Sequence, residues 1–365
     1  MVRPRGLTSA DGPTFVNNAS TVPDRRNTPT PGHPGQAAGE LPVTVAIITY
    51  NGRAHVGRCL KSLEGSGAFA TIVVDNCSTD GTVAFVLEHF SNVRVIANKV
   101  NGGFGAAANQ ALREARSRYV MLLNADTEVS RDTVGVLSRQ LDAHAAAAVA
   151  GPRLQDVDGT HQPSSFPFPG TWRWLFENSP VSLLTRGIPY LRDRSITFQR
   201  SPGWRAVPWV MGAVMLLRRE PVLGIGGFDE SFFMYYEEVD LCYRLSKSGW
   251  ETHFVPDCTV MHLGGGSTSQ VKDLMLRQRL RSTVRYYRRH CSRLRRWLWL
   301  AMVRARWAHV PMAAIAVILL RADGARWALA RAELGAWWRS AFDLPADGVA
   351  PGKGREPAFR SRNAR

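Results

Sequence analysis

Val43-Thr-Val-Ala-Ile-Ile48 is followed at once by the polar turn Thr49-Tyr-Asn-Gly52. The first run is short, apolar and rich in β-branched residues, which is typical of a buried strand. Three further apolar runs follow, separated by helical patterns: residues 71–74, 93–97 and 119–123. Strands that alternate with helices at this spacing predict an α/β fold, with a mostly parallel sheet flanked by helices on both faces.

Polar turns follow all four of these strands. Ligands of such sheets bind beyond the carboxyl ends of the strands, so the side chains of these turns are candidates for a binding site. Asp75 is placed to accept a hydrogen bond from the N–H of a nucleotide base, with an N-cap or an Asx turn as the alternative. The turns are Thr49–Asn51, Asp75–Asp80, Asn98–Gly103 and Asn124–Asp126.

A second group of candidates lies in the run Gly226–Arg244, which contains Glu237, Glu238 and Asp240. Carboxylates crowded in an apolar setting repel one another and lose solvation, and both effects raise a pKa toward the range of a general base. A solvated acidic helix face is the alternative. The flanking aromatic residues favour burial and therefore a catalytic role: Phe232, Phe233, Tyr235, Tyr236 and Tyr243.

Two residues far apart in the chain have the character of metal ligands. Asp126 follows a very apolar strand, where a carboxylate can hold a divalent cation against a diphosphate; a helix N-cap is the alternative. His262 ends the second of two predicted short strands, residues 252–255 and 259–262, and precedes three glycines. A lone histidine is more often structural, but its combination with Asp126 and the acidic run favours a metal site.

The turn Gly103-Phe-Gly-Ala-Ala-Ala108 matches the pattern G-x-G-x-x-A and follows a strand, so a dinucleotide-binding fold is an alternative. The turn is long and belongs to the third strand–helix unit, which weighs against that alternative. A glycine-rich helix start packed closely on the sheet explains the same residues.

Charge is distributed unevenly along the 365 residues, whose net charge is +16. Residues 271–365 hold 21 Lys and Arg against 6 Asp and Glu, so nearly all of the net charge lies there. Such a segment suits an anionic partner: nucleic acid, an acidic membrane surface or a phosphorylated lipid. The five cysteines have no CxxC spacing, which disfavours a disulfide framework or a zinc site.

The basic segment is predicted to be helical from Lys272, with one apolar stripe made of Leu280, Val284, Tyr287, Cys291, Leu294 and Leu298. Trp307–Leu320 lacks Asp, Glu, Lys and Arg but is short for a membrane span, so an interfacial helix is expected. Residues 160–205 are expected to form a long, partly ordered loop.

Together these segments resemble the family 2 inverting glycosyltransferases of the GT-A fold, over about residues 43–265. The finer resemblance is to the rhamnosyltransferase branch, which includes enzymes that transfer L-rhamnose from dTDP-rhamnose to GlcNAc-diphosphate-polyprenol. The pieces that carry it, in order, are Ile48–Asn51, Val74–Thr82, Asn101–Gly105 with Asn109, Leu123–Thr127, Gly212-Ala213, Gly227–Glu230 and Tyr236–Leu241.

The resemblance implies roles for individual residues. Asp126 and His262 would bind Mg²⁺ or Mn²⁺, although Asn124 stands where the family has the first acid of D-x-D. Glu238, at the second position of an acidic pair that is commonly Glu-Asp, would be the general base, with Glu237 beside it and Asp240 as the fallback. Nucleotide-sugar binding would involve Thr49, Tyr50, Asn51, Asp75, Asn101, Gly102, Gly103, Asn109 and Asn124, and acceptor binding Trp209, Gly212 and Ala213.

The implied organisation has five parts: a disordered segment (1–40), a nucleotide-sugar-binding half (41–150), an acceptor-binding and catalytic half (151–270), a basic, amphipathic, membrane-associated helical region (271–344) and a disordered tail (345–365). The protein is expected to be peripheral at the cytoplasmic face of the plasma membrane, without a signal peptide. Its expected partners are a nucleotide-sugar donor, a lipid-linked glycan acceptor and an anionic membrane surface, and not nucleic acid. The residues expected to enter the membrane interface are Trp297, Leu298, Trp299 and Trp307.

The resemblance leaves two kinds of alternative open. Another sugar donor, such as UDP-GlcNAc, UDP-galactose or GDP-mannose, would use the same chemistry. A nucleic-acid-binding protein that depends on the basic segment, or a catalytically inactive scaffold, would use none of it.

Overall fold

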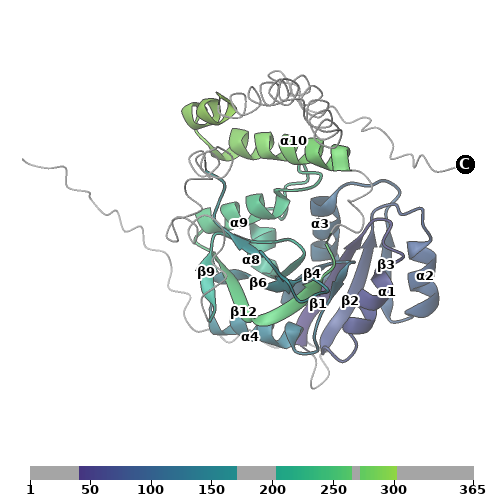
Figure 1. Cartoon of the computed structure of the whole chain (residues 1–365). Coiled ribbons are helices and arrows are strands. Elements are labelled where there is room, and N and C mark those ends of the chain that lie inside the picture. The colour runs from purple at the N-terminus through teal and green to yellow at the C-terminus, as the bar shows by residue number, and fades with distance from the viewer. Residues whose placement is uncertain (1–40, 171–202, 265–271, 302–365) are drawn as a thin grey trace, which may run out of the picture. The chain divides into compact units, whose positions relative to one another are not determined.

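The computed structural model describes residues 41–170, 203–264 and 272–301 (Figure 1). The expectations for residues 1–40, Trp307–Leu320 and the tail from 345 lie outside the described residues.

The first half of the sheet is parallel. It contains β1 (Leu41–Thr49), β2 (Ala68–Asp75), β3 (Val93–Ala97) and β4 (Tyr119–Asn124), in the order β3-β2-β1-β4. The helices between these strands are α1 (Val56–Ser62), α2 (Thr82–His89) and α3 (Phe104–Glu114). The predicted α/β alternation and all four predicted strands are therefore confirmed.

The second half of the sheet is mixed. Antiparallel β11 (Val214–Arg218) joins β4 to β6 (Ala147–Gln155), which is parallel to β12 (Glu251–His262). Residue 150, where the two functional halves are expected to meet, lies within β6, so the sheet is continuous there. The smaller elements are β5 (Thr127–Glu128), β7 (His161–Gln162), β8 (Ser165–Phe166), β9 (Arg205–Val207), β10 (Trp209–Val210), α4 (Thr133–Ala143), α8 (Arg219–Gly224) and α9 (Glu237–Lys247).

The two short strands predicted before His262 are a single strand, β12. Its register against β6 shifts between Val255 and Thr259. Pro256 lies in this interval and has no N–H to donate to the ladder, which interrupts the pairing without ending the strand. The gap between the two predicted strands is therefore a local irregularity within one strand.

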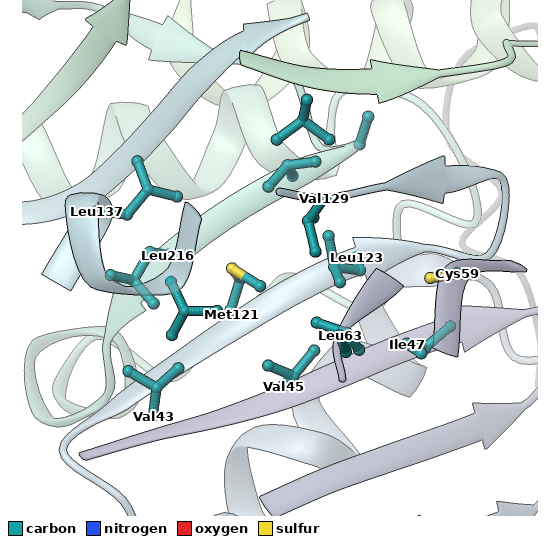
Figure 2. Close-up of a cluster of buried hydrophobic side chains, with 14 of the residues drawn as sticks. Val43, Val45, Ile47, Cys59, Leu63, Met121, Leu123, Val129, Leu137 and Leu216 are labelled. Carbon is teal, nitrogen blue, oxygen red and sulfur yellow. The ribbon is translucent and has the colours of Figure 1, made fainter. Parts of the chain in front are cut away.

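The core lies on both faces of the sheet because alternate side chains of each strand point to opposite faces. Val43, Val45 and Ile47 of β1 face α1, α2 and α4 (Figure 2). Ala46 and Ile48 of the same strand face α3, α8 and α9. This packing holds the carboxyl ends of the strands and the beginning of α9 in fixed positions.

The C-terminal segment begins with α10 (Lys272–His290), which packs against the protein body. Val284 and Tyr287 of the predicted apolar stripe are buried with Phe232 and Val239, next to α9. The stripe does not continue along one helix, because the chain turns at residues 291–292 before a second helical segment, 293–301.

One residue expected to enter the membrane interface is placed differently. Trp299 is buried and stacks on Tyr287, with ring centroids 4.4 Å apart. Its indole ring is already covered by the protein and is not available to a membrane. Trp297 and Leu294 remain 65% and 66% exposed.

Candidate active site

Three of the predicted site residues meet at one edge of the sheet because of strand register. Thr49 at the end of β1 pairs with Asp75 at the end of β2, and Ile48 pairs with Asn124 at the end of β4. The backbone N–H of Asn124 donates to the carbonyl of Ala213, which brings the segment before β11 to the same edge. The expected position of these residues at the carboxyl ends of the strands is confirmed.

The end of β2 carries a carboxylate that is only partly satisfied. Asp75 is 1% exposed, and its Oδ1 accepts a hydrogen bond from the Ser78 N–H at 2.8 Å. Its Oδ2 and the nearby Thr49 Oγ1 are buried without a partner among the described residues. A buried polar atom left unpaired costs about 1–3 kcal/mol, so these two atoms are suited to receiving a ligand.

Asn51 and Tyr50 lie beside them with different roles. Asn51 has a φ of 50°, and its Oδ1 accepts from the Thr79 N–H while its own N–H donates to Ser78 Oγ. The side chain of Asn51 therefore fixes the turn after β2. Tyr50 is half-buried, and burial raises the pKa of its hydroxyl.

The glycine-rich turn before α3 is packed against the segment that leads to α9. Gly103 has a φ of 87°, and a Cβ there would lie 2.2 Å from the Phe233 carbonyl oxygen. Asn101 Oδ1 accepts from the Gly103 N–H, and the Phe104 N–H donates to Phe233. Gly102 is exposed. Because protein backbone covers the start of α3, the dinucleotide alternative loses the free helix N-terminus that it requires.

Asn109 has a structural role instead of the expected contact with a nucleotide sugar. It is buried, its Nδ2 donates to the Phe228 carbonyl and to Glu230 Oε1, and its Oδ1 accepts from the Phe228 N–H. These bonds tie α3 to the loop after α8. The expectation for Asn109 is corrected because its amide is already occupied.

The two predicted metal ligands do come together. His262 in β12 pairs with Thr127 in β5, and the Leu263 N–H donates to the carbonyl of Asp126. His262 Nε2 lies 3.6 Å from Asp126 Oδ1, and both side chains are partly exposed. The sheet thus places a carboxylate and an imidazole side by side.

Gln162 in β7 orients the ring of His262. Its Nε2 donates to the His262 carbonyl at 2.8 Å, so its Oε1 is the atom that faces His262 Nδ1, also at 2.8 Å. An amide oxygen only accepts, so Nδ1 donates this hydrogen bond and Nε2 is the nitrogen that faces Asp126. Nothing in the neighbouring sequence indicates the role of Gln162, because its partner lies 100 positions away.

This donor set fits a divalent cation that is shared with a substrate. The described residues contain no group of three or more His, Cys, Asp and Glu side chains placed to hold a metal. One carboxylate and one imidazole leave several coordination positions for phosphate oxygens and water, as is common for Mg²⁺ bound with a nucleotide.

The candidate base lies at the start of α9, which follows two strained residues. Tyr235 and Tyr236 have φ values of 66° and 72°, in the left-handed region that non-glycine residues rarely adopt. Such conformations cost about 1–3 kcal/mol each and concentrate at functional sites. Here they turn the chain so that α9 begins directly at Glu237 and Glu238.

Glu237 and Glu238 are the predicted crowded pair. The Oε2 atoms of both are buried without a hydrogen-bond partner in the described part of the chain. Burial, and then the neighbouring Glu238 charge, raise the pKa of Glu237 well above its usual range. Burial also raises the pKa of Glu238, against hydrogen bonds from backbone N–H groups that include that of Gly212. Glu238 keeps the more exposed surface of the two, so it is the one a substrate can reach.

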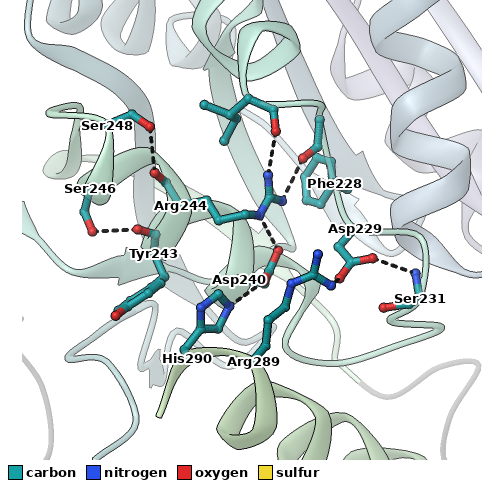
Figure 3. Close-up of polar contacts among 12 residues, drawn as sticks. Phe228, Asp229, Ser231, Asp240, Tyr243, Arg244, Ser246, Ser248, Arg289 and His290 are labelled. Carbon is teal, nitrogen blue, oxygen red and sulfur yellow. Dashed lines mark hydrogen bonds and ion pairs between the residues drawn. The ribbon is translucent and has the colours of Figure 1, made fainter. Parts of the chain in front are cut away.

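Asp240 is held in a different environment, which rules against its role as the fallback base (Figure 3). It is fully buried, its Oδ2 accepts from Arg244 Nε and its Oδ1 from His290 Nε2, both at 2.6 Å. Burial alone would raise the pKa of Asp240, but the hydrogen bonds and charges of His290 and Arg244 hold it below its usual value. A carboxylate with both oxygens paired and a lowered pKa is a poor proton acceptor.

Of the three predicted acceptor residues, Gly212 lies beside the candidate base, whereas Ala213 and Trp209 make other contacts. Gly212 lies against the side chain of Glu238, since a Cβ at Gly212 would be 3.7 Å from Glu238 Cβ. Ala213 is buried, and its expected contact with an acceptor is corrected to backbone pairing with Asn124. Trp209 stacks on Phe166 and donates its indole N–H to the Pro167 carbonyl, so its polar atom is also occupied.

Comparisons with known proteins indicate the family. The family model described as glycosyl transferase family 2 matches residues 44–200. The N-acetylglucosaminyl-diphospho-decaprenol L-rhamnosyltransferase of Mycobacterium tuberculosis is 30% identical over 243 residues, which cover 62% of this chain and 77% of that protein. Rhamnosyltransferase WbbL of Escherichia coli K12 is 24% identical over 268 residues, 68% of this chain and 93% of WbbL.

A solved structure extends the comparison to the fold. The mannosyltransferase PcManGT from Pyrobaculum calidifontis, in complex with GDP-Man and Mn²⁺, aligns with a TM-score of 0.51 at 17% identity. The alignment covers 84% of this chain and 88% of that one. At this identity the likeness concerns the fold alone.

Proposed function

Because the chain belongs to glycosyl transferase family 2 and has the GT-A fold of these enzymes, we propose that it transfers L-rhamnose from dTDP-rhamnose to a polyprenyl-diphosphate-linked glycan, with inversion at the anomeric carbon. The donor and acceptor rest on the relatives: one is named for L-rhamnosyl transfer to N-acetylglucosaminyl-diphospho-decaprenol, and WbbL is also a rhamnosyltransferase.

The observation that carries the proposed mechanism is the pair of crowded carboxylates at the start of α9, each with one buried oxygen that has no hydrogen-bond partner among the described residues. Glu238 accepts the proton of an acceptor hydroxyl while that oxygen attacks the anomeric carbon. The bond from that carbon to the donor diphosphate breaks, and its electron pair leaves with the nucleoside diphosphate. A single displacement of this kind inverts the configuration. The raised pKa of Glu238 makes it a stronger base than an ordinary glutamate.

The ends of β1 and β2 support a place for the nucleotide. Asp75 Oδ2 is a buried acceptor suited to a base N–H, and Thr49 Oγ1 is a hydroxyl suited to the base or the ribose. The turn at Asn51 and the glycine-rich turn at Gly103 border this position.

Asp126 and His262 are the residues that would hold Mg²⁺ or Mn²⁺, with Asn124 beside them. When bound, the cation supplies positive charge to the departing diphosphate. An imidazole in the donor set favours Mn²⁺ over Mg²⁺, which prefers oxygen ligands throughout. The neutral Asn124 leaves Asp126 as the main anionic ligand.

Replacing Gln162 by Leu is expected to weaken Mn²⁺ binding about 10- to 100-fold, the usual cost of losing a hydrogen bond that orients a metal ligand. Without the amide, His262 is free to rotate or to carry its proton on Nε2. Mn²⁺ titration followed by electron paramagnetic resonance measures this directly, with nucleoside diphosphate present. Gln140→Leu is the matched control, because Gln140 makes a similar contact with His253 at 2.9 Å. Equal affinities for Gln162→Leu and the wild type would remove Gln162 from the metal site.

We also propose that the protein acts at an anionic membrane surface, on its cytoplasmic side, as a lipid-linked acceptor requires. No helix in the described ranges is long and apolar enough to span a membrane. The helical segment 293–301 exposes Leu294 and Trp297, three positions apart and therefore on one face, among Arg293, Arg295 and Arg296. Apolar side chains surrounded by arginine suit an interface with acidic lipid headgroups.

The double substitution Leu294→Ser with Trp297→Ser is expected to reduce binding to vesicles that contain acidic lipids by at least about tenfold, since each exposed apolar side chain contributes roughly 1.5–3 kcal/mol when buried. Vesicle cosedimentation measures the binding. Leu87→Ser is the control, because Leu87 is also exposed, at 60%, but lies on α2. Unchanged partitioning of the double variant would place the membrane contact elsewhere. Deleting the chain from residue 271 is a poorer test, since it also removes α10 from the core.

The function itself is tested by nucleoside-diphosphate release from a panel of dTDP-, UDP- and GDP-sugars, with Mn²⁺ or Mg²⁺ and a GlcNAc-diphosphate-lipid acceptor. Acceptor-dependent release from dTDP-rhamnose alone is the expected result. Release from another donor would support the proposed transfer mechanism but overturn the assignment of rhamnose as the donor sugar. Absence of release from every donor, with active control enzymes, would overturn the proposed acceptor.

A further inference from the structure

Helix α10 is joined to the helix that carries the candidate base by a buried hydrogen bond (Figure 3). His290, the last residue of α10, donates from Nε2 to Oδ1 of the fully buried Asp240 at 2.6 Å. The other oxygen of Asp240 accepts from Arg244, one turn further along α9. Arg244 also donates to the carbonyls of Ile225 and Gly227, so α9, α10 and the loop after α8 meet at one carboxylate.

Asp240 lies on the opposite side of α9 from Glu238. Two successive steps of an α-helix rotate the side-chain direction by about 200°, which places Glu238 on the front of the helix and Asp240 on the back. A clamp on Asp240 therefore holds the first turn of α9 without touching the substrate side. Both residues belong to that first turn, so any shift of one moves the other.

Helix α10 also supports the strained residues that precede α9. Ser282 Oγ donates to the Met234 carbonyl at 2.8 Å, and the Tyr286 ring lies 5.5 Å from that of Tyr236. Arg289 pairs with Asp229 in the same loop. The left-handed conformations of Tyr235 and Tyr236 persist only where surrounding contacts enforce them. Helix α10 supplies two of those contacts, through Ser282 and Tyr286.

We propose that His290 is a positioning residue for the transfer reaction: by holding Asp240 it fixes the first turn of α9 and thereby the place of Glu238. This inference rests on the proposed role of Glu238 as the base. The basic C-terminal segment is then part of the machinery of the site, in addition to any contact with a membrane. A displacement of about 1 Å at a reacting group can lower a rate about a hundredfold, so the contribution of a remote clamp is measurable.

The test compares His290→Ala, His290→Gln and the wild-type full chain with whichever donor the enzyme turns over. His290→Ala is expected to lower kcat at least about tenfold while the Kd for the nucleoside diphosphate changes less than about twofold. His290→Gln is expected to recover most of kcat, because its amide N–H can make the same hydrogen bond to Asp240. His89→Ala is the matched control: His89 also ends a helix, α2, but is exposed and lies outside the site.

Amide hydrogen exchange provides a readout that does not depend on turnover. The Asp240 N–H donates to the Tyr236 carbonyl at 2.8 Å in the first turn of α9. In His290→Ala this amide is expected to exchange at least about tenfold faster, while amides of β1 and β4 keep their protection. If kcat is unchanged, if nucleotide binding weakens as much as kcat, or if exchange accelerates throughout the sheet, the positioning role is wrong. Should the wild type turn over no donor, the proposed function fails, and the exchange experiment still decides whether His290 clamps α9.

Discussion

Glu238→Gln is expected to lower kcat for sugar transfer by about 10²–10⁴-fold, the range that a positioned general base contributes. The amide keeps the size and shape of the side chain but cannot take the proton of an acceptor hydroxyl at neutral pH. The substitution removes a charge whose burial raises its pKa, so the folded protein is not expected to lose stability. Equilibrium binding of the nucleoside diphosphate should therefore stay close to that of the wild type.

The pH profile provides a second readout of the same substitution. A base must be deprotonated to act, so wild-type kcat should fall as the pH drops through the pKa of the base. Burial raises this pKa above that of an ordinary glutamate, and the fall is expected at a correspondingly higher pH. Because Glu237 and Glu238 interact, the apparent value belongs to the pair. The residual activity of Glu238→Gln should not show this fall in kcat at low pH.

Two further variants test whether the loss of activity is specific to Glu238. Glu237→Gln tests the neighbour: it should retain far more activity, because Glu237 is the more buried of the two and the less accessible to an acceptor. Glu114→Gln is the control for charge removal, since Glu114 forms an exposed ion pair with Arg94. Turnover of Glu238→Gln above about a tenth of the wild-type rate would move the base to another residue, and Glu237 would be the first candidate.

Local pattern was sufficient to predict the first half of the fold. The four apolar runs form β1 to β4, and each polar turn lies where a parallel sheet places the carboxyl end of a strand. Residue type carries this information because β1, β2 and β4 are buried on both faces of the sheet. It does not carry the order of strands in the second half, where β11 and β12 pair with partners far away in the sequence.

Side chains whose roles depend on tertiary contacts could not be predicted correctly. Asn109 belongs to a stretch that resembles a nucleotide-sugar motif, yet its amide binds the loop at Phe228. Asp240 is part of the acidic run in sequence, but His290 from α10 makes it a buried structural carboxylate. Neither partner is visible from the neighbouring sequence.

The amphipathic pattern of the basic segment also does not reveal its tertiary partners. A stripe that recurs at helical spacing predicts that one face is covered, but it does not identify what covers it. Val284 and Tyr287 pack on the protein, whereas Leu294 after the turn is exposed. The meeting of Asp126 and His262 is the opposite case: the resemblance led to the expectation, and the pairing of β12 with β5 provides its physical cause.

Asp126→Ala is the second substitution for which a large effect is expected: about a hundredfold or greater loss of kcat in saturating donor. A cation at a departing diphosphate is worth several kcal/mol in the transition state, and each 1.36 kcal/mol corresponds to a factor of ten in rate. Since Asn124 is neutral, Asp126 is the anionic ligand of the proposed site. Replacing it by alanine leaves His262 as the remaining predicted ligand of the cation. Transfer kinetics across a Mn²⁺ titration measure the loss.

The dependence on added metal separates this role from a structural one. In Asp126→Ala the Mn²⁺ concentration needed for half-maximal activity, and the Kd for Mn²⁺ measured by electron paramagnetic resonance, should both rise at least about tenfold, while dTDP binding without metal stays unchanged. Asp142→Ala is the control, because Asp142 pairs with Arg118 at the other end of the sheet. Full wild-type activity after chelation of all divalent ions would contradict the metal role, and the leaving diphosphate would then need its positive charge from arginine or lysine side chains.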